Sequence, residues 1–307
     1  MAGAEYGVFR RVKMGMAHLG FDRGRLCRLF LCRNRSLRNR LGIWICPYVL
    51  CMTLHSSLTH EALHGHPTNN PYINALLVFP SLSLLVPYLR FKDLHLAHHR
   101  DEFLTDPYDD PESNFMDPDL WQSVPKGMQR VFRLNNTLLG RMLIGPLLGQ
   151  WRFMREDAKA IAQGDARAAL GWVLHIPAAG IVIWGVLYFG SMPLWMVMLA
   201  SYGAMSLLKV RTFLEHRAHD KARARTVVIE DRGIWAFLFL NNSFHVVHHM
   251  HPQVPWYDLP ALYRARKDHF LARNEGYVYK SYTDIFKQFF FKPKDEVPHP
   301  LWSKPLK

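Results

Sequence analysis

A box of three histidines with the spacing HxxHH occurs twice in this chain, at His95–His99 and again at His245–His249. On a helix, a rotation of about 100° per residue places the three imidazoles of such a box on one arc, so they can point at shared metal sites. A third motif, His60–His64 with the letters HEALH, has two histidines one helical turn apart on the same face. We therefore expect a fold that brings three distant segments together around metal.

The number of box histidines predicts two metal ions. Eight histidines in the three motifs are too many for one ion, which binds about four to six ligands. Imidazole is a ligand for zinc, copper, iron and nickel, but zinc has no redox chemistry. An all-nitrogen site with open positions favours redox-active iron. Such a centre is what activation of O₂ against an unactivated C–H bond requires, because no side chain can remove that hydrogen.

Two alternatives use the same histidines. His60–His64 also matches HExxH, the zinc metalloprotease signature in which the glutamate is the general base. A protease would need one further ligand and would leave both HxxHH boxes without a role. The other alternative is a membrane protein that binds metal and catalyses nothing. Loss of Glu61 would inactivate a protease, whereas an oxidoreductase would depend on every box histidine.

Long uncharged runs predict membrane helices beside the boxes. Leu41–Thr59 has 19 residues without a formal charge, which is about one bilayer span. Ala168–Leu208 has 41 such residues and is broken near Gly190–Pro193, which predicts two spans joined by a tight turn. Pro67–Leu89 is also uncharged, but its four prolines predict a broken or in-plane element. We expect Gly233–Tyr257, which contains the last box, to be a site helix rather than a span.

The charge pattern predicts an orientation in the membrane. The net charge is +13, and residues 1–40 contribute +8 from 10 Lys and Arg against Glu5 and Asp22. No nucleic-acid-binding motif accompanies this arm, so anionic lipid head groups are the expected partner and nucleic acid is not. Lys and Arg flank the outer ends of Ala168–Leu208 and are missing at its turn. The positive-inside rule then places these ends, and the boxes, on the cytoplasmic side.

These features predict an all-α integral membrane protein: a bundle of about three to four spans with a cytoplasmic helical cap that holds a histidine-rich di-metal site. Residues 1–40 would form a basic arm and residues 41–303 one membrane domain, because no linker-like run divides them. The segment Thr105–Pro111, with the letters TDPYDDP, is typical of a loop. Isolated histidines such as His299 are expected to be structural.

The three motifs, in this order, resemble the histidine boxes of the membrane fatty acid desaturase superfamily, whose pattern is HxxxH, HxxHH and HxxHH. The resemblance covers roughly residues 54–303 and includes Asn241–His249 and Pro255–Pro260. It implies two iron ions, O₂, a lipid or acyl substrate and an external electron carrier of the ferredoxin, rubredoxin or cytochrome b5 type. The implied reaction is insertion of a C=C bond, with hydroxylation or carotenoid ketolation as alternatives. One span, Leu41–Thr59, precedes the first box, where family members usually have two.

The resemblance also implies one more ligand before the last box, for which His216 is the best candidate. The implied ligands of the two irons are then His60, His64, His95, His98, His99, His216, His245, His248 and His249. His219, His66 and His251 are weaker candidates, because each lies close to a ligand position. Carboxylates orient ligand imidazoles through the second ring nitrogen. The candidates for that role are Glu61, Asp101 and Glu215, followed by Asp93 and Asp106.

Overall fold

A computed structural model describes residues 41–190 and 192–303, and for residues 41–44 and 101 it describes the backbone alone. The predicted basic arm lies outside the described residues. The described part is mostly helical, and its regular strands form one short parallel pair. The all-α prediction is confirmed in this sense.

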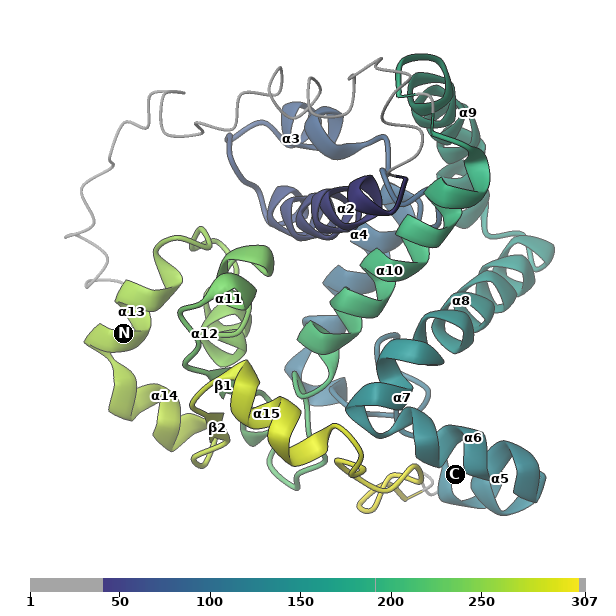
Figure 1. The fold of residues 1–307 in the computed structure, drawn as a ribbon. Coiled ribbons are helices and arrows are strands. Elements are labelled where there is room, and N and C mark those ends of the chain that lie inside the picture. The colour runs from purple at the N-terminus through teal and green to yellow at the C-terminus, as the bar shows by residue number, and fades with distance from the viewer. Residues whose placement is uncertain (1–40, 191, 304–307) are drawn as a thin grey trace.

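The elements follow one another as shown in Figure 1. The helices are α2 (Leu41–Leu63), α3 (Pro71–Val78), α4 (Tyr88–His98), η3 (Asp101–Phe103), α5 (Pro118–Ser123), α6 (Lys126–Asn135), α7 (Leu138–Leu143), α8 (Gly145–Ala162), α9 (Ala166–Phe189), α10 (Leu194–Thr212), η4 (Ala222–Ala224), α11 (Ile234–Leu238), α12 (His245–Met250), α13 (Leu259–Ala265), α14 (Lys267–Arg273) and α15 (Tyr282–Phe289). The strands are β1 (Val228–Ile229) and β2 (Val278–Tyr279), in register as Val228 with Val278.

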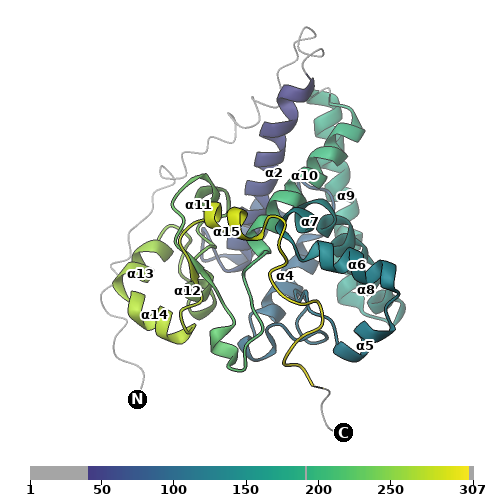
Figure 2. The same ribbon diagram turned by 60° about the horizontal axis from the view of Figure 1, so that its bottom comes forward.

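Helices α2, α9 and α10 rise together from the rest of the molecule (Figure 2). Helix α10 packs along α2 around a buried cluster that includes Tyr48, Met52 and Val197. The two helices approach closely at Gly203, where an added Cβ would lie 2.9 Å from Val49 Cγ2. In the part of the chain that the structure describes, one helix, α9, is long and apolar enough to cross a membrane.

The predicted interruptions of the uncharged runs are confirmed. Helix α9 ends at Phe189 and α10 begins at Leu194. Pro67–Leu89 contains the short helix α3 and, at its end, the first two residues of α4. Helix α3 begins at Pro71 because Asn70 caps it: the Asn70 side chain accepts hydrogen bonds from two backbone N–H groups of the first turn.

The prediction of one site helix within Gly233–Tyr257 is wrong in detail. The structure has two short helices there, α11 and α12. Between them, Leu240 and Asn241 have φ of 48° and 53°, in the left-handed region that ends a right-handed helix. The break turns α12 so that the whole last box is buried beside the other two motifs.

Candidate metal centre

The nine predicted ligands come from four segments. His60 lies in the last turn of α2 and His64 just beyond its end. Helix α4 carries His95 and His98, with His99 as its C-cap, and α12 carries the last box. His216 lies in the segment after α10. Seven of the nine are buried; His99 and His216 are half-buried.

The structure brings these nine side chains into two groups, in each of which the candidate ligand atoms lie within 4.8 Å of one another. The five-histidine group is His60, His64, His95, His99 and His248. The four-histidine group is His98, His216, His245 and His249.

Each HxxHH box serves both groups because of helix geometry. In the box of α4, His95 and His99 are one turn apart and enter the five-histidine group, whereas His98 diverges by about 60° and enters the other. In α12 the assignment is reversed: His245 and His249 share a face, and His248 points to the five-histidine group. One turn of helix thus supplies ligand atoms to two neighbouring sites.

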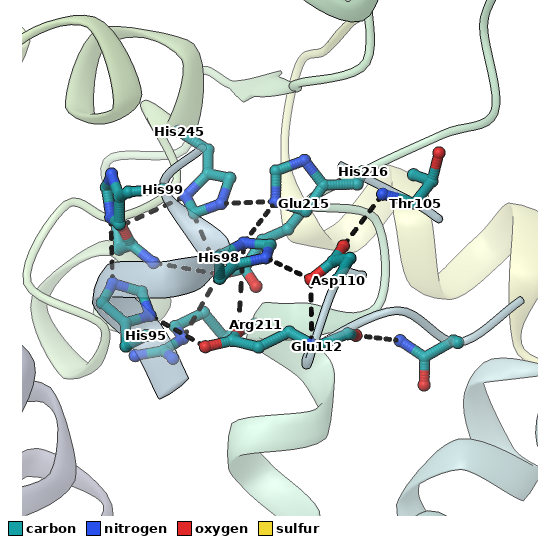
Figure 3. A network of polar contacts seen from close by, with 12 residues as sticks. His95, His98, His99, Thr105, Asp110, Glu112, Arg211, Glu215, His216 and His245 are labelled. Atoms are coloured by element: carbon teal, nitrogen blue, oxygen red, sulfur yellow. Dashed lines mark hydrogen bonds and ion pairs between the residues drawn. The ribbon is translucent and has the colours of Figure 1, made fainter. Parts of the chain in front are cut away.

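The Nε2 atoms converge at distances that fit metal ligands. In the five-histidine group they are 3.1 Å apart for His64 and His95, 3.0 Å for His95 and His99, and 3.1 Å for His99 and His248. In the four-histidine group, His216 Nε2 lies 2.9 Å from His98 Nε2 and 3.1 Å from His245 Nε2 (Figure 3). Two nitrogens bound at right angles to one ion, each at about 2.1 Å, would be about 3.0 Å apart.

An orphaned nitrogen supports the same interpretation. His60 Nε2 is buried and has no hydrogen-bond partner among the described residues. A buried polar atom without a partner is costly, and a metal ion would provide the missing interaction.

The electrostatics keep most of these rings neutral, the form that binds metal. Burial and the neighbouring His95 and His249 lower the pKa of His64 to about 2. Burial also lowers the pKa of His245 and His248 well below the ordinary value. His98 differs: burial lowers its pKa, but the neighbouring carboxylates outweigh that effect and raise the pKa to about 9. A metal ion at His98 would therefore replace a proton.

Two of the carboxylates that hold the rings were missed by the sequence analysis. Glu112 Oε1 lies 2.8 Å from His95 Nδ1, and Asp110 Oδ1 lies 2.7 Å from His98 Nδ1 (Figure 3). Both lie in or next to the segment that the sequence analysis interpreted only as a loop. The available signal was a pair of acidic residues, two positions apart, closely following a histidine box.

The predicted carboxylates contribute less directly. Glu215 Oε1 is 3.9 Å from His245 Nδ1 and accepts a hydrogen bond of 2.9 Å from Asn242, whose Oδ1 is itself 3.2 Å from that ring nitrogen. Asn242 is thus the direct partner of His245, which the sequence analysis missed. Glu61 Oε1 is 3.8 Å from His60 Nδ1, and its Oε2 accepts from the backbone N–H of Trp256 at 3.1 Å. The side chain of Asp101 is outside the described part.

The weaker candidates lie elsewhere. Asp93 pairs with Arg167 at 2.8 Å on the surface, and Asp106 accepts from the backbone N–H groups of its own loop. His219 pairs with Glu275 at 3.3 Å. His66 and His251 are in neither histidine group.

Comparisons with known proteins show the family to which the chain belongs. A family model described as "Fatty acid desaturase" matches residues 39–282, which contain all nine histidines together with Asp110 and Glu112. The chain is 22% identical over 249 residues to an "Acyl-lipid omega-3 desaturase (cytochrome b5), endoplasmic reticulum" of Arabidopsis thaliana. That match covers 70% of this chain, and the chain spans about 60% of the length of the relative.

Proposed function

Because this chain belongs to the fatty acid desaturase family, we propose that it is a membrane oxidoreductase that uses O₂ to insert a C=C bond into the acyl chain of a lipid. The observation that carries the proposal is the pair of adjacent, buried histidine groups. In the overall reaction the acyl chain loses two hydrogens. These hydrogens, two external electrons and two protons from water reduce O₂ to two waters.

Each histidine group would hold one iron ion. When bound, the iron pair would supply the activation of O₂ and the hydrogen abstraction that no side chain can perform. The protein would contribute neutral imidazoles, and burial would exclude bulk water from them. Asp110, Glu112 and Asn242 would fix the orientation of three rings through their Nδ1 atoms.

The family and the apolar surface of α9 support the proposed lipid substrate and partners. Large apolar side chains are exposed along α9, among them Val173, Ile176, Ile181 and Trp184, as expected of a helix that faces lipid. We propose that α2, α9 and α10 are the spans and that the histidines lie on the cytoplasmic face. The name of the Arabidopsis relative includes cytochrome b5, which supports an external electron carrier of the cytochrome b5 type. A carrier of the ferredoxin or rubredoxin type is the alternative.

Hydroxylation or ketolation is the alternative within the family, since these reactions begin with the same hydrogen abstraction and differ in leaving oxygen in the product. The zinc protease alternative has less support. His60 and His64 share their group with three further histidines, and the Glu61 carboxylate accepts a backbone hydrogen bond. That bond leaves Glu61 poorly placed as a base.

Metal analysis of the detergent-purified protein, together with lipid profiling of expressing cells, tests the proposal. We expect about two irons per chain and new unsaturated acyl chains for the wild type. His248→Ala removes a ligand from the five-histidine group, so its iron content should fall to about one per chain and the new unsaturated acyl chains should be lost. The matched control is His269→Ala, since His269 is exposed on α14. One zinc per chain that survives His248→Ala would refute the proposal in favour of a protease. Oxygenated lipids would instead identify a hydroxylase or ketolase.

A further inference from the structure

A C-terminal segment of the chain, after the last residue of the family match, packs against the loop beside the metal centre. We call residues 294–302 the C-terminal strap, drawn in yellow after α15 in Figure 2. Its backbone pairs with Met116, whose N–H donates to Val297 O at 2.9 Å and whose carbonyl accepts from His299 N at 2.8 Å. The Lys294 backbone N–H donates to Asn136 O at 3.0 Å. We call residues 105–112, which carry Asp110 and Glu112, the carboxylate loop. The strap is therefore tied to the chain that follows this loop.

His299 is the side chain of the strap that points into this loop. It is 4% exposed, and its Nδ1 accepts a hydrogen bond from the backbone N–H of Leu301 at 3.1 Å. A neutral ring in that arrangement carries its proton on Nε2. That atom lies 3.1 Å from Thr105 Oγ1, so it donates to the threonine hydroxyl.

Thr105 is held in a conformation that it would not adopt alone. Its φ is 71°, in the left-handed region that is rare for a β-branched residue. Such strain persists only where the surroundings over-determine the residue. Here the hydroxyl is bound by His299, the carbonyl accepts from Ser113 Oγ at 3.0 Å, and the N–H donates to Asp110 Oδ2 at 2.8 Å.

Asp110 passes this restraint to the metal centre. It is 2% exposed, and one of its oxygens is bound by Thr105. The other oxygen accepts from the backbone N–H of Glu112 at 2.9 Å and contacts His98 Nδ1 at 2.7 Å. Figure 3 shows Thr105, Asp110 and His98 as a continuous chain of contacts that ends at the four-histidine group.

We propose that His299 is a positioning residue for the four-histidine group: from the C-terminal strap it holds Thr105 and Asp110, and through them the ring of His98. The inference rests on the proposed function, because it takes that group to be an iron site. The five-histidine group receives its carboxylate from Glu112, which His299 does not touch. Loss of His299 should therefore weaken the binding of one iron, the one in the four-histidine group.

The test compares the detergent-purified wild-type chain with His299→Ala and His299→Gln, and with His269→Ala as a matched histidine control. Iron release into a chelator is followed over time, and Mössbauer spectra of the loaded proteins report each iron environment. We expect His299→Ala to release one of its two irons roughly tenfold faster, since loss of outer partners typically costs 10–100-fold in affinity. The spectrum of that iron alone should change. His299→Gln should restore the wild-type release rate and the wild-type spectrum, because the glutamine amide can donate a hydrogen bond in place of Nε2.

Equal release rates and an unchanged spectrum in a folded His299→Ala protein would overturn the inference while leaving the proposed function intact. If His299→Ala does not fold, Thr105→Val decides the question. It removes the same hydroxyl contact with little change of shape, and it should weaken the same iron; retention of both irons at the wild-type rate would overturn the inference. A wild type that binds no iron would overturn the proposed function and this inference together.

Discussion

Replacing Asp157 by alanine should destabilise the protein by roughly 3–5 kcal/mol, because it would leave the buried guanidinium of Arg90 without its partner. Arg90 Nε lies 3.0 Å from both carboxylate oxygens of Asp157, and Nη2 lies 2.7 Å from one of them. The two residues are 8% and 2% exposed. Trp172 Nε1 donates to the same carboxylate at 2.8 Å and would also lose its acceptor.

The contacts of Asp157 join α4 to two helices outside the metal centre. Arg90 lies in the first turn of α4, which carries the first HxxHH box, whereas Asp157 is on α8 and Trp172 on α9. The loss of a buried partner is costly, but replacing both charges by apolar residues of similar size often costs little. The double variant Arg90→Met with Asp157→Leu should therefore recover most of the lost stability.

Thermal unfolding in detergent measures this effect, and Asp93→Ala is the matched control. Asp93 also pairs with an arginine, Arg167, but that pair is on the surface, where such contacts contribute about 0–1 kcal/mol. We expect a large fall in Tm for Asp157→Ala, a small one for Asp93→Ala, and recovery in the double variant. A fall for Asp157→Ala no larger than that of the control would refute the reasoning.

Three further predictions concern the metal centre. His216→Ala should leave about one iron per chain, because it removes a ligand from the four-histidine group alone; elemental analysis that still finds two irons would exclude His216 as a ligand. Glu61→Gln should keep its iron and its lipid products, since this carboxylate is bound to the Trp256 backbone; complete inactivation with metal retained would favour the protease. Removal of iron by a chelator should lower Tm, and added ferrous iron should restore it, because an ion that binds only the folded chain stabilises it. An unchanged Tm would argue against ions bridging α2, α4 and α12.

Several features of the fold were readable from local chemistry. The break between α9 and α10 follows from Gly190 and Pro193, and the shortness of α3 follows from the prolines around it. The three motifs also predicted that distant histidines converge, and the structure brings His60, His95 and His248 into one group. The extra histidine His216 came from the resemblance to a family rather than from its own neighbours in the sequence.

The pairing across the site was decided only by tertiary structure. Helical spacing determined that His95 and His99 share a direction, because rotation per residue is a local property of the chain. It could not determine that His248, about 150 residues away, faces them, nor that Asp110 and Glu112 turn back onto the box that precedes them. His299 shows the limit most clearly. As an isolated histidine it carries no signal in the sequence, and it acquires a place beside Thr105 only because the C-terminal strap packs there.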